Sequence, residues 1–253
     1  MFGYSEIFND FSYEPDRTVD YICFTDDPDL QSENWQIRQV PKGLLDPTRA
    51  AKRIKILAHQ YLGEYGSSLY VDNTIRLKRR PEEIFENFLD ASASPLVCFR
   101  HPWRECVFQE AVAVLEAGYD DPGRVQEQMA WYRFLGYPCE NGLTQSGFML
   151  RRHNDPKLIN VMETWAEQLL RFSLRDQLSF KVAAWFHGFE PAVKDLDWMS
   201  NNVLEWPVVK GHRLPRDFND ARYLELHPDV RVNRINPRKH FLLHGLNEGR
   251  LYK

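Results

Sequence analysis

An acidic side chain with polar neighbours follows an apolar stretch at residues 67–71. The stretch is rich in β-forming residues and predicts a strand that ends at Asp72, Asn73 and Thr74. Ligands of α/β proteins collect outside the carboxyl ends of strands, so Asp72 and Asn73 are expected to reach a cation or a phosphate-bearing ligand. Aspartate and asparagine also form turns through their own side chains, and a simple turn at Asp72 is the alternative.

Two further polar strand ends are expected beside Asp72. One β-type run ends in Thr25 and Asp26, and another contains Ser146 and Gly147. A glycine inside a strand indicates a bulge or a close approach of a ligand to the backbone. If the three ends share one rim of a sheet, they form one site. A single carboxylate among oxygen and amide groups suits Mg²⁺ or Mn²⁺, which is completed by water and substrate phosphates.

A carboxylate and an amide stand together at Asp176 and Gln177, where the pattern predicts the start of a helix. Aspartate is also a normal residue at a helix N-terminus, so capping alone would explain it. The functional alternative is that Asp176 faces the rim. There it would act on an acceptor hydroxyl or orient a sugar, as a general base or through hydrogen bonds.

Two histidines are weaker candidates. His101 stands near Arg104, and the two would contact a phosphate or an acceptor, although a surface loop explains them equally well. His212 lies in a Gly-His-Arg turn typical of an exposed loop. A neutral imidazole at His212 would nevertheless be a suitable further ligand for Mn²⁺.

A basic helix is predicted directly before the Asp72 strand. Asp46 is placed as its N-cap, and Pro47 occupies its first position. Its polar face carries Arg49, Lys52 and Lys55. A solvated amphipathic face is the simpler interpretation. The position of the helix before the candidate site favours a role in binding phosphate.

Composition excludes several classes of protein. With 43% hydrophobic and 27% charged residues and a net charge of −4, the chain is an ordinary globular protein without the basic excess of a nucleic-acid binder. Its four cysteines lack metal-binding spacing, which indicates reduced thiols in a cytoplasmic setting. No stretch resembles a membrane span or a secretory leader, so membrane contact is expected only from the surface. No Ser-His-Asp order, phosphate-binding glycine loop or HExxH motif supports a hydrolase or P-loop enzyme.

Strands alternate with helices along most of the chain, which predicts an α/β sheet covered on both faces. Prolines and a glycine between residues 205 and 215 indicate a change of domain. The sequence therefore predicts a main domain over residues 1–212 and a small helical module over residues 213–253.

Five separated motifs resemble, in their order, the glycosyltransferase-like domain shared by plant mucilage-synthesis proteins and many bacterial polysaccharide proteins. They are residues 23–26, 49–55, 68–75, 101–106 and 175–180. The resemblance covers about residues 1–212 and implies a GT-A-like (Rossmann-like) mixed, mostly parallel sheet flanked by helices, whose first strand is abbreviated here. Residues 223–250 separately resemble a short module that accompanies bacterial glycosyltransferases, for which docking is the modest interpretation.

The resemblance implies transfer of a sugar from a nucleotide-sugar donor to a saccharide or glycan acceptor. Asp72 corresponds to the metal-binding acidic motif, and His212 lies where a late histidine completes the Mn²⁺ or Mg²⁺ site in related enzymes. Asp176 and Gln177 would act on the acceptor or donor sugar, and His101 with Arg104 would contact the acceptor. Residues expected to contact the donor are Thr25, Asp26, Arg49, Lys52, Lys55, Asp72, Asn73, Ser146 and Gly147.

A non-catalytic alternative stays open at this point. The sequence Asp72-Asn73-Thr74 is not a strict Asp-x-Asp motif. A carbohydrate-binding or assembly subunit that keeps the fold without turnover would also fit. A lipid hydrolase, a label carried by some plant relatives, is a weaker third possibility because no nucleophile or zinc cluster supports it.

Overall fold

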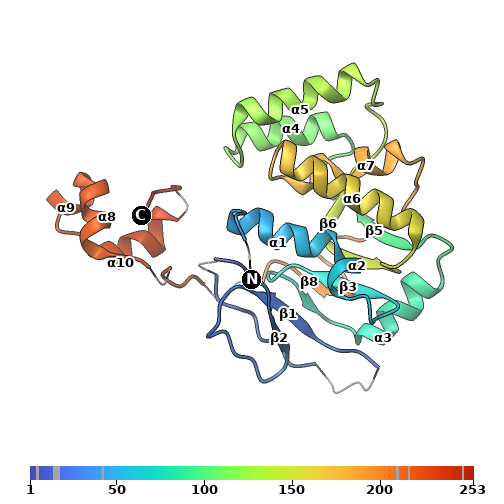
Figure 1. The fold of residues 1–253 in the computed structure, drawn as a ribbon, viewed down its shortest axis with the longest axis horizontal. Helices are drawn as coiled ribbons and strands as arrows, with labels where there is room; N and C mark the ends of the chain where they lie inside the picture. The colour runs from blue at the N-terminus through green and yellow to red at the C-terminus, as the bar shows by residue number, and fades with distance from the viewer. Residues whose placement is uncertain (4–5, 14–17, 42, 209–210, 216, 247) are drawn as a thin grey trace. The chain divides into compact units, whose positions relative to one another are not determined.

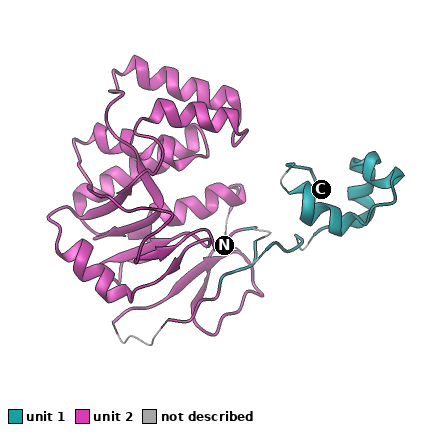
Figure 2. Cartoon of the chain, turned by 180° about the vertical axis from the view of Figure 1, so that it is seen from behind, with its two compact units in different colours: residues 1, 3–9, 209–253 teal, residues 2, 10–208 magenta. Residues whose placement is uncertain are grey.

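The computed structural model describes residues 1–3, 6–13, 18–41, 43–208, 211–215, 217–246 and 248–253. The chain forms two compact units (Figure 2). The larger unit contains Phe2 and Asp10–Val208, and the smaller unit contains Met1, Gly3–Asn9 and Val209–Lys253. Each unit is described by itself below.

The larger unit alternates strands and helices along its length (Figure 1). Its strands are β1 (Ile22–Thr25), β2 (Gln36–Gln39), β3 (Ser68–Val71), β4 (Arg76–Leu77), β5 (Leu96–Arg100), β6 (Thr144–Arg151), β7 (Ala192–Lys194) and β8 (Leu204–Glu205). Its helices are α1 (Pro47–Ile56), α2 (Ala58–Tyr61), α3 (Pro81–Ile84), the π-helix η1 (Phe85–Asp90), α4 (Val107–Glu116), α5 (Pro122–Phe134), α6 (Pro156–Arg171), the 3₁₀ turn η2 (Asp176–Leu178) and α7 (Phe180–Phe186).

The helix starts follow the expected local chemistry. Asp46 accepts a hydrogen bond from the backbone N–H of Arg49, and Pro47 opens α1, as the sequence predicts. The same aspartate–proline pair starts α5 and α6. In each case the carboxylate satisfies an N–H group that has no partner within the helix, and proline has no N–H to lose there.

The main sheet has the strand order β3-β6-β5-β7. β6 is antiparallel to both β3 and β5, whereas β7 is parallel to β5. The expected α/β class, with a mixed sheet flanked by helices, is confirmed. The expectation of a mostly parallel sheet is wrong, because only the β1–β2 and β5–β7 pairs are parallel among the five pairs of named strands in the described residues.

Alternating side chains of the central strands fill two core layers. Leu96 and Cys98 of β5 pack with Met149 of β6 beneath α1, α6 and α7, which lie together on one side of the sheet (Figure 1). Val97 and Phe99 face the opposite layer. That layer includes α3, η1, β4 and β8. The sheet is therefore covered on both faces, as expected.

One edge of this sheet gathers several polar strand ends. β3, β5 and β7 run in the same direction, so their carboxyl ends lie at one edge together with the amino end of β6. At this edge Asp72, His101 and Asp195 follow the ends of β3, β5 and β7, respectively. By contrast, β1 pairs only with β2 among the named strands.

The smaller unit is helical, with α8 (Asp220–Leu226), α9 (Pro228–Val232), α10 (Pro237–His240) and the π-helix η3 (Phe241–Gly245). Its core is formed by Phe218, Tyr223, Val230 and Phe241. In the described residues of the whole chain, no helix has the length and apolarity that crossing a bilayer requires. All four cysteines are free thiols.

Candidate functional site

Asp72 lies immediately after β3 and begins a turn, while the expected contact of its carboxylate with a cation or a phosphate stays a prediction. The backbone of Ile75 donates to the Asp72 carbonyl at 2.9 Å, which closes a turn over Asn73 and Thr74. The carboxylate itself stays accessible, with 44% of the side chain exposed. Its Oδ1 accepts a hydrogen bond of 2.7 Å from the hydroxyl of Tyr70. The turn therefore presents an oriented carboxylate at the sheet edge.

Gly147 is the point at which Asp72 meets strand β6. The pairing of β5 with β6 shifts register here, as expected for a glycine inside a strand, since Cys98 faces Met149 but Phe99 faces Gln145. The Gly147 carbonyl accepts a hydrogen bond from the Asp72 N–H at 2.8 Å. A Cβ at Gly147 would lie 2.7 Å from Oδ2 of Asp72. The absence of a side chain thus makes room for the carboxylate.

Gly147→Ala is expected to displace the Asp72 carboxylate and to lower the free energy of unfolding by up to about 1 kcal/mol, less than overpacking of a core, because the carboxylate is partly exposed and can turn away. Gly66→Ala is the matched control, because a Cβ at Gly66 meets nothing within 4 Å. Urea unfolding of both variants measures the difference. Equal midpoints for the two variants would show that the space beside Asp72 is not tight.

Asp176 lies at the centre of a buried charge cluster that we call the lysine–aspartate cluster: Lys52, Lys55, Asp176 and Ser146. Asp176 is only 5% exposed. Its Oδ1 lies 3.0 Å from Nζ of Lys52, and its Oδ2 lies 2.6 Å from Nζ of Lys55. The Ser146 hydroxyl donates to Oδ2 at 3.0 Å. Helix α1, strand β6 and turn η2 therefore meet at one carboxylate.

The charge state of Asp176 follows from these neighbours. Burial alone would raise the pKa of the carboxyl, but the ammonium groups of Lys52 and Lys55 hold it well below the usual range. The carboxylate is therefore ionised at neutral pH and is a weak proton acceptor. Two roles were expected for Asp176, general-base catalysis and hydrogen bonding. An ionised carboxylate that already binds two lysines fits the second role better than the first.

Lys55 connects the two acidic residues. Its Nζ lies 3.9 Å from Oδ1 of Asp72 as well as beside Asp176, and it sits 4.9 Å from the centroid of the Tyr70 ring. The backbone of Lys55 is held too, because the buried guanidinium of Arg151 donates to its carbonyl at 2.5 Å. Arg151 also donates to the Ser68 hydroxyl at 3.1 Å. Lys55 is thus fixed at both its main chain and its ammonium group.

Tyr70 and Arg151 were not among the residues expected at the site. A signal for Tyr70 exists in the sequence, because side chains two apart on a strand share a face, which puts Tyr70 beside Asp72. Arg151 has no such local signal. Burial lowers its pKa to about 10. Its contacts join β6 to the end of α1, which are far apart in the sequence.

Gln177 lies next to this cluster. Its side-chain amide donates to Oε1 of Gln145 at 2.8 Å, at the start of β6. Its Oε1 accepts a hydrogen bond from Arg175 at 3.3 Å. Nε of Arg175 is buried and has no hydrogen-bond partner among the described residues. Gln177 is thus held at the same edge of the sheet as Ser146.

His101 and Arg104 follow the end of β5. Nδ1 of His101 accepts hydrogen bonds from the backbone N–H groups of Trp103 and Arg104, at 3.3 and 3.1 Å. Burial, together with the charges of Arg104 and Arg175, lowers the pKa of His101 to about 4, so the ring is neutral at pH 7. Arg104 forms an ion pair with the buried carboxylate of Glu110. The expected acceptor role of both residues stays a prediction.

Thr25, Asp26 and Arg49 are among the expected donor contacts that lie outside the lysine–aspartate cluster. Thr25 is fully buried at the end of β1, where its hydroxyl accepts from the N–H of Asp27 at 3.0 Å. Asp26 follows it and is half-buried. Because β1 belongs to a separate two-stranded sheet, these residues do not share a rim with β3 by strand pairing. Arg49 donates to the carbonyls of Leu169 and Phe172, so it ties α1 to the end of α6.

His212 belongs to the smaller unit, where it forms an isolated β-bridge with Glu6. Its expected role as a metal ligand therefore stays a prediction. Within the described residues, no group of three or more His, Cys, Asp or Glu side chains is arranged to hold a metal ion. Asp72, beside the lysine–aspartate cluster, offers an accessible carboxylate. One carboxylate is enough for Mg²⁺ or Mn²⁺ when phosphate oxygens and water supply the other ligands.

Residues 25–192 match the family described as TOD1/MUCI70, glycosyltransferase-like domain. The matched range contains both acidic residues of the site and both lysines. Over 146 residues the chain is 28% identical to an Arabidopsis thaliana protein named "Probable hexosyltransferase MUCI70". This stretch covers 54% of the chain and 25% of the relative, so the chain spans about a quarter of that relative's length.

A solved structure similar to this chain is mouse xyloside xylosyltransferase 1 in its apo form. The similarity has a TM-score of 0.38 at 18% sequence identity. It covers 65% of this chain and 63% of the mouse chain.

Proposed function

Because the chain belongs to the TOD1/MUCI70 glycosyltransferase-like domain family, we propose that it transfers a sugar from a nucleotide-sugar donor to a hydroxyl group of a saccharide or glycan acceptor. One observation carries the proposal. An accessible carboxylate, Asp72, lies 3.9 Å from a buried lysine at the edge of the sheet where strands end. The cytoplasm is the proposed setting, because all four cysteines are free thiols.

Transfer breaks the bond between the anomeric carbon of the donor sugar and the oxygen of its diphosphate. It forms a bond from that carbon to the acceptor oxygen, which gives up its proton. The bond electrons leave with the nucleoside diphosphate, so negative charge develops on the leaving group. Groups that stabilise this charge lower the barrier.

Lys52 and Lys55 would supply positive charge for the leaving diphosphate. Two ammonium groups share the single carboxylate of Asp176, which leaves one positive charge in excess in the lysine–aspartate cluster. Asp176 would act here as a positioning residue that holds both lysines. The Ser146 hydroxyl would form a hydrogen bond with the diphosphate beside these lysines, since it already contacts Lys55 and Asp176.

Asp72 would hold Mn²⁺ or Mg²⁺ together with the diphosphate oxygens, whereas the metal role expected for His212 from the sequence stays a prediction. When bound, the ion would neutralise charge on the diphosphate. Thr25, Asp26 and Asn73 are proposed to contact the nucleoside side of the donor. His101 and Arg104 are proposed to contact the acceptor, and the neutral imidazole would serve it as a hydrogen-bonding group rather than as a charge.

Calorimetric titration of the chain with UDP and with GDP, each with and without Mn²⁺, tests the donor site. Saturable binding of one nucleotide is expected, and Asp72→Ala should weaken it by about 10- to 100-fold, the worth of one charge-assisted contact. Asp90→Ala is the control, because Asp90 is also an exposed carboxylate, with Arg152 as its ion-pair partner at 3.7 Å. The proposal would be refuted if the chain bound neither UDP nor GDP, or if Asp72→Ala and Asp90→Ala bound the nucleotide equally well.

A non-catalytic carbohydrate-binding or assembly subunit is the second candidate. The saturation of Asp176 by two lysines favours it, because the lysine–aspartate cluster then holds no carboxylate poised to accept a proton. Release of free sugar from UDP-sugars or GDP-sugars discriminates the two. Nucleotide-dependent sugar release or transfer supports the enzyme, whereas saccharide binding without either supports the subunit.

A further inference from the structure

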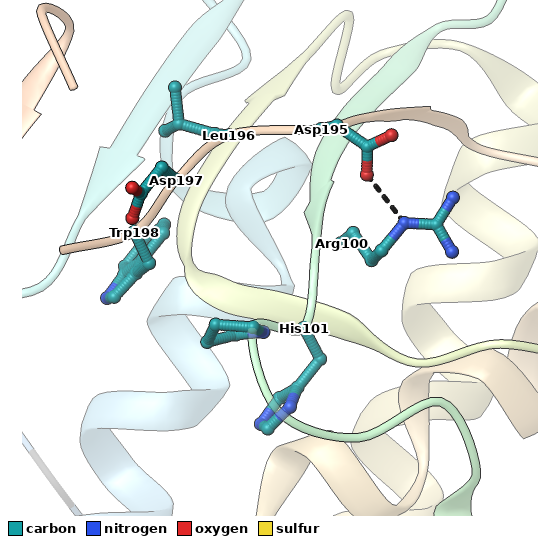
Figure 3. Close-up of a pocket in the computed structure, with 7 residues that line it drawn as sticks. Arg100, His101, Asp195, Leu196, Asp197 and Trp198 are labelled. Carbon is teal, nitrogen blue, oxygen red and sulfur yellow. Dashed lines mark hydrogen bonds and ion pairs between the residues drawn. The ribbon is translucent and has the colours of Figure 1, made fainter. Parts of the chain in front are cut away.

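A pocket of about 430 Å³ opens beyond the ends of β5 and β7 (Figure 3), and no residue of the lysine–aspartate cluster lines it. It is lined by Arg100, His101, Pro102, Asp195, Leu196, Asp197 and Trp198. Its volume lies within the range of about 300–1,000 Å³ typical of small-molecule sites. None of these residues except His101 has a role in the proposed function.

Tryptophan rings form a chain beside this pocket. The ring of Trp103 lies 5.7 Å from that of His101 and 6.2 Å from that of Trp206, measured between centroids. The Trp206 ring in turn lies 6.1 Å from the ring of Trp198, which lines the pocket. Trp103 is 57% exposed, so a flat apolar surface is open to a ligand. Such a surface suits the apolar face of a pyranose ring, which carries C–H groups.

Hydrogen-bonding groups for hydroxyls stand around the same pocket. Asp195 is 78% exposed at its side chain and pairs with Nε of Arg100 at 2.6 Å (Figure 3). Oδ1 of Asp197 accepts from the backbone N–H groups of Met199 and Ser200, which fixes that carboxylate. Carboxylates accept hydrogen bonds from sugar hydroxyls, and the remaining guanidinium N–H groups donate to them.

The indole N–H of Trp198 is a buried hydrogen-bond donor that needs an acceptor. Trp198 is 2% exposed, and its Nε1 has no hydrogen-bond acceptor among the described residues. Buried polar groups in folded proteins are almost always paired. A water molecule or a hydroxyl group bound next to the indole would supply this acceptor.

We propose that this pocket is an acceptor subsite for an uncharged saccharide, with the sugar ring against Trp103 and its hydroxyls on Asp195 and Arg100. Two carboxylates against one guanidinium give the pocket a net negative charge, and the neutral His101 ring adds none. A uronic acid unit would meet repulsion from Asp195 and Asp197. The subsite is therefore specific for neutral sugar units over acidic ones.

The topology connects the subsite to the donor site. β3, which ends at Asp72, and β5, which ends at the pocket, are parallel and separated only by β6. Two strand spacings amount to about 10 Å, a span that one or two sugar units would bridge. The acceptor role rests on the proposed function, whereas saccharide binding by the pocket does not.

Calorimetry and saturation-transfer NMR of the full chain with xylotetraose, cellotetraose and tetragalacturonic acid test the subsite. A neutral tetrasaccharide is expected to bind more tightly than the acidic one. Trp103→Ala should weaken neutral binding by about tenfold through loss of the aromatic surface, and Trp103→Phe should retain most of it. Phe134→Ala is the matched control, since Phe134 is an aromatic residue 79% exposed on α5 outside the pocket.

Charge selectivity is tested by Asp195→Asn, which removes one negative charge and releases Arg100. This variant should bind neutral probes less tightly and tetragalacturonic acid more tightly than the unmodified chain. Failure of both neutral probes to bind, preference of the unmodified chain for the acidic probe, or indifference to Trp103→Ala would each overturn the subsite. UDP and GDP titrations of the same samples separate the two proposals, because lost nucleotide binding bears on the proposed function alone.

Discussion

Asp176→Ala is expected to lower the free energy of unfolding by about 3 kcal/mol, because it leaves the buried ammonium group of Lys55 and the half-buried one of Lys52 without their carboxylate. Lys52 and Lys55 contact Asp176 at 3.0 and 2.6 Å. Among the described residues, the one other carboxylate within ion-pair distance of either lysine is that of Asp72, 3.9 Å from Lys55. Chemical denaturation followed by circular dichroism measures the loss. An Asp176→Ala variant as stable as the unmodified chain would show that the lysines are solvated rather than buried.

A compensated variant separates folding from function at this site. Asp176→Leu combined with Lys52→Met and Lys55→Met replaces the buried ions by apolar side chains of similar size, a change that is often neutral or stabilising. We expect this triple variant to recover most of the stability lost in Asp176→Ala. Nucleotide binding should not return with it, because the positive charge has gone. Recovery of both would show that the lysines have no part in binding the donor.

His101→Asn is expected to flatten the dependence of stability on pH between about 6.5 and 4. A histidine in the unfolded chain binds a proton below its ordinary pKa of 6.5, whereas folded His101 binds one only below about 4. Protons therefore favour the unfolded state within this window, and the free energy of unfolding falls as the pH decreases. The difference in pKa corresponds to at most about 3 kcal/mol.

Asparagine keeps an oxygen where Nδ1 of His101 accepts the N–H groups of Trp103 and Arg104, so the turn after β5 is preserved. Urea midpoints of the variant and the unmodified chain at pH 7, 5.5 and 4.5 measure the effect. Burial also lowers the pKa of His153, so part of the slope should persist in the variant. Parallel profiles for the two proteins would show that His101 is already protonated in the folded state at pH 5.5.

Local patterns were enough to predict the parts of the site that single elements position. The Asp72 strand end and the start of α1 follow from strand propensity and capping chemistry. Lys52 and Lys55 are three residues apart and therefore share a face of the helix. What the lysines contact could not be predicted, because Asp176 lies more than 100 residues further along the chain.

Strand direction and sheet membership were also beyond local reasoning. The sequence of β6 predicts a buried strand but does not reveal its direction. Its antiparallel pairing with β3 and β5 is set by the fold. Likewise, nothing in residues 22–25 reveals that β1 pairs with β2 rather than with the main sheet. The pocket was missed because its tryptophan chain, at residues 103, 198 and 206, comes together only through the fold.

The hydrogen bond from Arg151 to the carbonyl of Lys55, near the end of α1, limits how far the site can move when a donor binds. Its guanidinium anchors the main chain of Lys55 to β6, while Asp176 already restrains the lysine ammonium group. A side chain immobilised before the ligand arrives has little rotational freedom left to lose. The donor would therefore meet a rigid electrostatic template, and any induced movement would fall to the turn after β3 rather than to the helix.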